Sequence, residues 1–283
     1  MRVAEFVDFI AERQCIFDRR SSGKRKPWTE DKILQLYRFC NVKRENDTET
    51  IWIAKNWRDP YQDHPNLWFL LLVARFLNWH PTLAELSPAR ILKFDIADTR
   101  EKLHARAARG DKVFTGAYTV STNGISMNKI DYLCAHVFVP ASDRLTFGVW
   151  GGKSSGLRGI HARLVDLQGL SDFMAGQVIA DIKYARPYKE ALDWDSFAVM
   201  GPGSKRGMNR VNMRPTELSW PSLTWDHAMT QLRKEMEKPL KAALGNGYSL
   251  HAQDVQNCLC EFDKYERVRL GEGRPRSTYP GRF

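Results

Sequence analysis

The sequence predicts a mainly α fold with little or no β structure. Apolar side chains recur at a helical period in the first residues, at Val3, Phe6, Val7 and Ile10. Residues 67–77 are apolar on nearly every side, which is typical of a helix buried at the centre of a helical domain. Much of the rest of the chain also carries helix caps and stop signals.

Further helices are expected along the chain from these signals. Thr29 is a good N-cap for the second helix, with acidic residues in the first turn. The other expected helices include residues 89–94, 95–109, 127–139, 224–244 and 250–270. Residues 117–120 fit either a short strand or an extended loop. Residues 148–154 resemble a phosphate-binding loop, but only three residues separate Gly148 from Gly152, where that loop needs four. We therefore reject a kinase loop there.

Length and composition limit the protein class. The 283 residues suffice for a single helical domain, or for two lobes, about 1–110 and 111–283, with the active site between them. The formal net charge of +10 favours a polyanion partner. The five Cys residues form no Cys-x-x-Cys pair, so a disulfide framework or structural zinc is not expected. The charged N-terminus is no signal peptide, and the longest apolar run, residues 67–74, is too short to span a bilayer.

A tight glycine hairpin is expected between two helices in the stretch from Leu167 to Ile182. It resembles the helix-hairpin-helix of base-excision DNA glycosylases, in which hairpin amides and the following helix N-terminus hold a DNA phosphate. The resemblance implies a helical DNA-glycosylase-like fold, with Gly169 and Ser171 as DNA contacts. Ser171 stands where the second glycine of that motif is expected. The alternative is a short connection between two core helices.

The run from Gly201 to Gly203 occupies the place where those glycosylases carry a catalytic Asp. The absence of that Asp argues against N-glycosidic cleavage. The residues that follow suit a phosphate or pyrophosphate, because free amides, a helix N-terminus and cations attract anions. We expect Ser204 to be the N-cap. The expected ligands are Ser204, Lys205, Arg206 and Arg210. The alternative is a capped surface helix with ordinary basic residues.

Two other stretches are candidates for binding. Lys24, Arg25 and Lys26 lie in a basic loop that could contact DNA phosphates, or could be a solvated linker. A second set consists of polar residues that recur at a spacing of three, and these would share roughly one face if the stretch is helical. These residues are Arg38, Asn41, Arg44 and Asp47. A pocket edge and a solvated face are both open on spacing alone.

Several stretches agree with one family. They are Lys26-Pro27-Trp28-Thr29, Tyr37 to Val42, Asn56-Trp57-Arg58, Asn78-Trp79, Phe173 to Val178, Gly201 to Arg210 and Asp254 to Tyr265. Together they resemble the alpha-glutamyl/putrescinyl thymine pyrophosphorylases, phage enzymes of thymidine hypermodification that are also described as amino acid:DNA transferases. A related helical domain accompanies 5-hydroxymethyluracil DNA kinases.

The resemblance implies a transferase. A kinase activates the hydroxymethyl group of 5-hydroxymethyluracil in DNA as a pyrophosphate ester, and the transferase then displaces pyrophosphate with an amino acid or amine. The implied partners are double-stranded DNA containing modified thymine and a free amino acid or polyamine, with no membrane. The implied location is the cytoplasm of the phage-infected host. No metal site or cofactor is expected, although Mg²⁺ could accompany pyrophosphate.

This chemistry requires base flipping, a pyrophosphate site, a base for the incoming amine, and a cation for an amino-acid carboxylate. The candidate bases are Asp47, Asp254, Glu261 and Asp263. The candidate substrate-binding residues are Arg38, Asn41, Arg44, Ser204, Lys205, Arg206, Asn209, Arg210 and Gln256. Cys258 or Cys260 could add to the pyrimidine ring, but a buried helix thiol is the favoured interpretation.

Two other functions stay open at this point. One is a DNA glycosylase, against which the missing Asp argues. The other is a non-catalytic DNA-binding module that partners a 5-hydroxymethyluracil DNA kinase.

Overall fold

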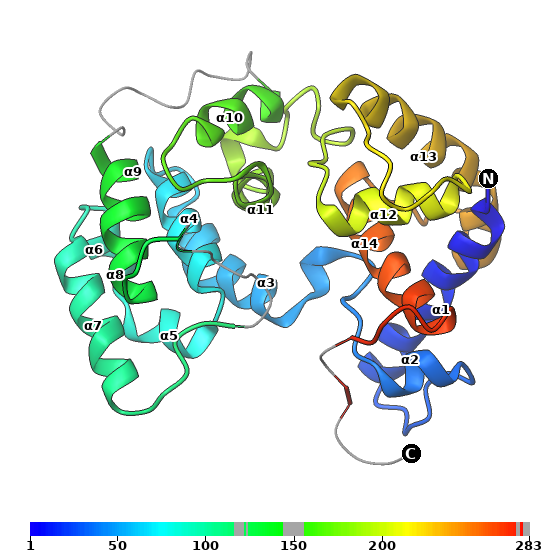
Figure 1. The fold of residues 1–283 in the computed structure, drawn as a ribbon, viewed down its shortest axis with the longest axis horizontal. Helices are drawn as coiled ribbons and strands as arrows, with labels where there is room; N and C mark the ends of the chain where they lie inside the picture. The colour runs from blue at the N-terminus through cyan, green and yellow to red at the C-terminus, as the bar shows by residue number, and fades with distance from the viewer. Residues whose placement is uncertain (116–121, 123, 144–155, 276–277, 280–283) are drawn as a thin grey trace. The chain divides into compact units, whose positions relative to one another are not determined.

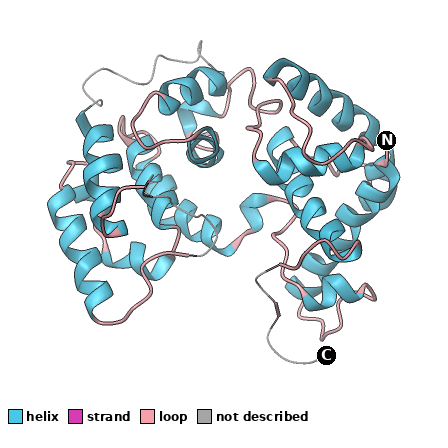
Figure 2. Cartoon of the chain, in the orientation of Figure 1, coloured by secondary structure: helices cyan, strands magenta, loops and turns pink. Residues whose placement is uncertain are grey.

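The computed structural model describes residues 1–115, 122, 124–143, 156–275 and 278–279, and these residues form a helical protein (Figure 2). Within these ranges the β pairing is an isolated antiparallel bridge between Tyr37 and Thr278. The predicted mainly α fold is therefore confirmed. Two stretches considered from sequence, 117–120 and 148–154, lie outside the described residues.

The chain forms two compact units. Unit 1 comprises residues 1–47 and 198–283, and unit 2 comprises residues 48–197. The lobe boundary expected near residue 110 falls inside unit 2. Local sequence patterns do not reveal this division, because unit 1 pairs the first helix with helices from the other end of the chain. The expectation of an active site between two lobes stays a prediction.

Unit 1 is built around three long helices that share one hydrophobic core. Phe6 of the first helix packs edge-on against Phe262 of the last, with ring centroids 5.2 Å apart. The third helix, residues 222–244, contributes Trp225, Leu232 and Leu240 to this core. The helices of the unit are α1 (Val3–Ser21), α2 (Lys32–Leu36), η1 (Arg44–Asn46), α12 (Pro202–Val211), α13 (Ser222–Leu244) and α14 (Ala252–Arg269).

The helix after the basic loop begins later than predicted. Asp31, not Thr29, caps it, since one carboxylate oxygen of Asp31 accepts the backbone N–H groups of Ile33 at 2.8 Å and Leu34 at 3.0 Å. Its other carboxylate oxygen accepts the Tyr265 hydroxyl at 2.6 Å. Asp31 therefore fixes this short helix to α14.

Unit 2 has a fully buried helix, α4 (Leu67–Leu77), as the sequence predicts. It packs against α11 (Asp172–Ile182). The other elements in this unit are α3 (Thr48–Ile53), η2 (Ala54–Arg58), η3 (Asp59–Tyr61), α5 (His80–Glu85), α6 (Pro88–Ile91), α7 (Ile96–Ala108), α8 (Lys129–Leu133), η4 (Cys134–Phe138), α9 (Val139–Asp143), α10 (Gly156–Val165) and η7 (Arg186–Tyr188). Figure 1 labels the α-helices of both units.

A helix, a tight turn and a second helix occur where the glycine hairpin is expected. Gly169, with φ of 84°, makes the turn after α10, and the Ser171 hydroxyl caps α11 by accepting the Met174 N–H at 3.3 Å. A side chain at position 169 would lie 2.8 Å from Val137, so only glycine fits there. The turn lies between two helices as expected, and both its likeness to the glycosylase hairpin and its contact with DNA stay predictions.

A buried ion pair joins α4 to α11. Arg75 and Asp181 are both buried and bond in a bidentate manner. The same guanidinium also donates to the Asn78 amide oxygen at 3.0 Å and to the Thr50 hydroxyl at 3.1 Å. Removing one partner from such a network leaves a buried charge without its counter-ion.

None of the helices in the described ranges combines the length and the apolar character needed to cross a membrane.

The Arg75–Asp181 pair yields a stability prediction. Asp181→Ala should lower the free energy of unfolding by about 3–5 kcal/mol, because it strands the Arg75 charge in the core. The matched control is Asp172→Ala in the exposed first turn of the same helix, which should cost about 1 kcal/mol or less. Urea unfolding followed by circular dichroism measures both. Equal losses for the two variants would show that the buried pair contributes nothing.

Candidate functional site

The site candidates that come together lie in unit 1, and they depend on a close contact between α12 and α14. Gly203 and Gly207 lie one helical turn apart and both face α14. A Cβ atom at Gly203 would lie 2.4 Å from the Cys260 sulfur, and one at Gly207 would lie 2.0 Å from the Leu259 carbonyl oxygen. The two backbones approach closely only because these positions lack side chains.

This contact brings the arginines of α12 to a buried carboxylate on α14. Asp263, about 3% exposed, accepts the Nε–H of Arg210 at 2.8 Å and that of Arg206 at 3.2 Å. Arg267, one turn further along α14, forms a 3.3 Å ion pair with the same carboxylate. Asp263 is thus the counter-ion of three guanidinium groups, which is a poor situation for a general base.

The outer nitrogens of two of these arginines bond to carboxylates from flanking loops. Arg206 Nη1 bonds to Glu217, and Arg210 Nη2 bonds to Glu272. The bond from Arg210 holds the pKa of Glu272 below its usual value, against a small opposing effect of burial. The Nε atoms of both guanidinium groups bond to Asp263, and their Nη atoms are the N–H donors that would suit a phosphate group in place of the two glutamates.

Ser204 does not have its predicted position. Gly201 is the N-cap of α12 and Pro202 opens the helix, so Ser204 lies at the third helical position and is fully buried. Its hydroxyl accepts the Gly201 N–H at 2.9 Å and the Gln256 side-chain amide at 3.2 Å. The glycine turn thus serves helix capping and packing, and Ser204 and Gln256 satisfy one another. Lys205 is half-buried and has no ion-pair partner among the described residues.

Asn209 fixes the loop between α12 and α13. It is fully buried, and its amide donates to the carbonyl oxygens of Thr216 and Leu218, each at 2.9 Å. Its side-chain oxygen accepts the Trp220 indole N–H at 2.7 Å. Asn209 therefore positions this loop, and its expected contact with substrate stays a prediction.

The condition for a shared face at residues 38–47, a helical stretch, is not met. The chain leaves α2 at Leu36 and is irregular from residue 38 to residue 43. Arg38 is exposed and stacks on the Tyr279 ring at 5.8 Å, whereas Arg44 is buried. The Asn41 amide donates to the Asn46 carbonyl at 2.7 Å, and its oxygen accepts from Arg20 at 2.9 Å. Residues spaced by three share a face only if the chain is helical, and residues 38–43 are not helical.

Burial dominates the environment of the Asp47 carboxyl group. Burial raises the pKa of its carboxyl group, although the N–H donated by Asn41 at 3.0 Å and the charges of Arg44 and Arg13 oppose that rise. A carboxyl group with a raised pKa accepts a proton more readily than an exposed one.

The other two carboxylate candidates are engaged by partners on α14 and near it. Glu261 accepts both the Lys264 ammonium, at 2.7 and 2.8 Å, and the Cys40 N–H at 3.0 Å. Asp254 forms a 3.2 Å contact with His251 and accepts the Arg44 N–H at 3.3 Å. Asp47 therefore differs from Glu261, Asp254 and Asp263, which contact a lysine, a histidine and arginines respectively.

The cysteines of α14 are protonated thiols at neutral pH. Burial raises the pKa of Cys258 and of Cys260 to about 11 in each case. Cys258 is fully buried, and the Cys260 sulfur fills the space beside Gly203. This environment favours the buried-thiol interpretation over addition to a pyrimidine ring, because only the thiolate is a strong nucleophile.

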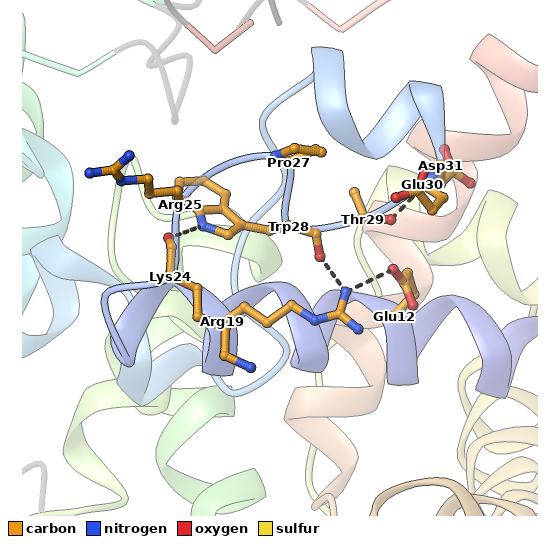
Figure 3. A pocket seen from close by; sticks show the side chains of 9 residues that line it. All are labelled: Glu12, Arg19, Lys24, Arg25, Pro27, Trp28, Thr29, Glu30 and Asp31. Carbon is orange, nitrogen blue, oxygen red and sulfur yellow. Dashed lines mark hydrogen bonds and ion pairs between the residues drawn. The ribbon is translucent and has the colours of Figure 1, made fainter.

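The basic loop borders a cavity of about 560 Å³ beside α1 (Figure 3). Lys24 and Arg25 line it together with Arg19 and Trp28, and Lys26 lies outside the lining, 5.3 Å from the Trp28 ring. The Trp28 indole N–H bonds to the Lys24 carbonyl at 2.7 Å, and Arg19 bonds to the Trp28 carbonyl. This loop is therefore anchored to α1, unlike a solvated linker.

Sequence reasoning missed several residues of the site. Arg267 could have been found from its spacing of four after Asp263. Glu217 and Glu272 lie in loops, where no periodic signal marks them. No group of three or more His, Cys, Asp or Glu side chains that could hold a metal ion occurs in the described part of the chain.

Comparison with known proteins assigns the family. Residues 1–274 match the family model described as "5-hmdU DNA kinase, helical domain". The chain belongs to this family. It is 28% identical over 231 residues to a 5-hmdU DNA kinase of Bacillus phage SP10, a match that covers 73% of this chain and 35% of the relative. The chain thus spans about a third of that relative's length. No solved structure matches the chain.

The contact between α12 and α14 yields the second stability prediction. Gly207→Ala should destabilise the protein by at least about 2 kcal/mol, because the clash with the Leu259 carbonyl outweighs the roughly 1 kcal/mol that alanine gains in a helix. The control is Gly247→Ala, where a side chain meets nothing within 4 Å. Thermal unfolding compares the two. An unchanged melting temperature for Gly207→Ala would mean that α12 does not lie this close to α14.

Proposed function

We propose that the chain is a transferase of phage thymidine hypermodification. In this reaction an amino acid or amine displaces pyrophosphate from 5-pyrophosphoryloxymethyluracil in DNA. Membership of the 5-hmdU DNA kinase helical-domain family and the match to a Bacillus phage kinase support a role in this modification. The resemblance to the alpha-glutamyl/putrescinyl thymine pyrophosphorylases favours the transfer step over phosphorylation.

The observation that carries the proposal is the arginine cluster of α12. Arg206 and Arg210 are held through their Nε atoms by the buried Asp263, and their outer nitrogens point to carboxylates that are partly exposed. Pyrophosphate gains negative charge as it leaves, and preorganised donors stabilise that charge without reorganising. The two arginines are the groups proposed to bind it.

The incoming nucleophile must lose a proton to attack the methylene carbon. Asp47 is the proposed base, since burial raises its pKa against the opposing charges of Arg44 and Arg13. The carbon–nitrogen bond forms as the carbon–oxygen bond to pyrophosphate breaks, and the amine proton goes to Asp47.

The remaining parts of the proposal concern partners. Double-stranded DNA would contact the hairpin at Gly169 and Ser171 and the basic loop at Lys24, Arg25 and Lys26. The nucleophile would be a free amino acid or polyamine, with Arg38 or Arg44 as the carboxylate partner. We place the reaction in the cytoplasm of the infected host, without a resident cofactor, and Mg²⁺ could accompany the leaving pyrophosphate.

A second candidate function is a non-catalytic DNA-binding module for a 5-hmdU DNA kinase. The match to the helical domain of such kinases, covering 35% of the Bacillus phage relative, favours it specifically. A module of this kind would bind DNA and leave the nucleosides unchanged.

The test is a single-pot transfer assay. The purified chain is mixed with DNA containing 5-pyrophosphoryloxymethyluracil and a pool of amino acids and polyamines, and the digested nucleosides are analysed by mass spectrometry. A new thymidine adduct with released pyrophosphate is expected. Tight DNA binding with unchanged nucleosides would instead support the module, and loss of the base would support a glycosylase.

Arg206→Ala should lower the transfer rate about 100-fold, the usual effect of removing one preorganised donor to a developing charge. The control is Lys234→Ala on the exposed face of α13, which removes one positive charge that does not belong to the cluster. Pyrophosphate release measured under single-turnover conditions gives both rates. Full activity in Arg206→Ala would remove this arginine from the mechanism.

The raised pKa of Asp47 predicts the pH dependence of transfer. The base must be ionised, so kcat/KM should rise with pH as Asp47 loses its proton, with a midpoint above about 3.9, the ordinary value for Asp. Asp47→Asn should abolish this acidic limb and most of the activity, while Asp8→Asn on the exposed face of α1 should change neither. An unchanged pH profile in Asp47→Asn would assign the base elsewhere.

A further inference from the structure

The two carboxylates that contact the arginine cluster are not used by the mechanism above. We propose that Glu217 and Glu272 are specificity-determining residues, which cover the outer nitrogens of Arg206 and Arg210 and yield only to a multiply charged phosphate group. The proposal rests on the proposed function, because it concerns the same arginine site.

The guanidinium groups of Arg206 and Arg210 are fixed through their Nε atoms. Asp263 is buried and holds the Nε atoms of Arg206 and Arg210, and α12 and α14 meet through glycine on the α12 side. A ligand that binds the outer nitrogens therefore replaces Glu217 and Glu272 and leaves the arginines in place.

Glu217 has an exposed side chain on a backbone that is held, and that side chain accepts from Arg206 and from the Thr216 hydroxyl at 3.4 Å. The buried Asn209 amide bonds to the carbonyl oxygens of Thr216 and Leu218, which flank Glu217 on both sides. The Glu217 side chain itself is 71% exposed. Rotation of the side chain alone thus uncovers Arg206, without movement of the loop.

Glu272 is positioned by the end of α14. Its backbone N–H bonds to the Arg267 carbonyl at 2.7 Å, and the N–H of Gly271, with φ of 72°, bonds to the Val268 carbonyl at 3.1 Å. This pattern is the Schellman motif, which fixes the residue after the helix-ending glycine. The Glu272 side chain, 43% exposed, reaches Arg210 from that point and can also turn to solvent.

The charges in the cluster balance. The guanidinium groups of Arg206, Arg210 and Arg267 face the carboxylates of Asp263, Glu217 and Glu272. A phosphodiester of the DNA backbone carries one negative charge, so it can replace one of the two exposed carboxylates but not both. Pyrophosphate carries several charges on two linked groups and can bond to both arginines at once.

This difference matters in a DNA substrate, where backbone phosphodiesters far outnumber pyrophosphate esters. Arginines without carboxylate partners would bind any phosphodiester of the DNA backbone. Arginines that are paired with Glu217 and Glu272 disfavour a singly charged phosphodiester and still bind the more highly charged pyrophosphate. Selection through a repulsive element of this kind is a general means of specificity.

The experiment measures two probes with ³¹P NMR titration: inorganic pyrophosphate and diethyl phosphate, a phosphodiester with one charge. The variant is Glu217→Gln with Glu272→Gln, which keeps side-chain size and removes both negative charges. The matched control is Glu235→Gln on the exposed face of α13, whose contact is with Gln231. Circular dichroism checks that each variant is folded.

In the natural protein, pyrophosphate should bind and diethyl phosphate should bind far more weakly. In the double variant both should bind more tightly, and the ratio of the two dissociation constants should fall about tenfold, because the repulsion that rejects the weaker anion is gone. Each single variant should give part of this change, and Glu235→Gln none.

An unchanged ratio in the double variant overturns the proposal. If, at the same time, Arg206→Ala loses pyrophosphate binding, the arginine site of the proposed function stands and only the role of the two glutamates fails. If pyrophosphate binds neither to the natural protein nor to the double variant, the arginine site and the glutamate role fail together.

Discussion

The arrangement of unit 1 depends on the close approach of α12 to α14, where Gly207 lies against the Leu259 carbonyl. A Cβ atom there would be 2.0 Å from that oxygen, so any side chain would push the helices apart. The separation of the helices sets the reach of the arginines. At this distance Arg206 and Arg210 meet Asp263, and a wider gap would separate the buried carboxylate from both α12 arginines and leave it with Arg267 of its own helix. Packing and electrostatics therefore constrain one another.

Sequence reasoning found what local periodicity encodes. The buried helix α4 and the glycine turn at Gly169 between two helices were predicted correctly, because an apolar period and a glycine turn are properties of a few neighbouring residues. The grouping of the two α12 arginines with Asp263 could not be predicted, since Arg210 and Asp263 are 53 positions apart. The spacing of three around Asn41 would have placed side chains on one face only in a helix, and the chain there is not helical.

The four candidate carboxylates show how neighbours separate groups that look alike in sequence. Asp263 neutralises arginines, Glu261 binds the Lys264 ammonium, and Asp254 contacts His251. A carboxylate held by a cation is a weak base, because protonation would break the ion pair. Asp47 differs, since burial dominates its environment and raises its pKa. The distinction depends on packing, which composition and spacing do not report.

The arginine cluster and the overall basic charge have separate physical roles. The formal net charge of the protein is +10. In the arginine cluster, however, the guanidinium groups of Arg206, Arg210 and Arg267 are balanced by the carboxylates of Asp263, Glu217 and Glu272. A surface that only attracts DNA gains from unpaired lysines and arginines, because each one releases counterions from the backbone. A balanced and partly buried cluster adds little to such attraction. Its rigidity and its exchangeable carboxylate partners instead suit the binding of one specific anion, and this feature favours the proposed transferase over the DNA-binding module.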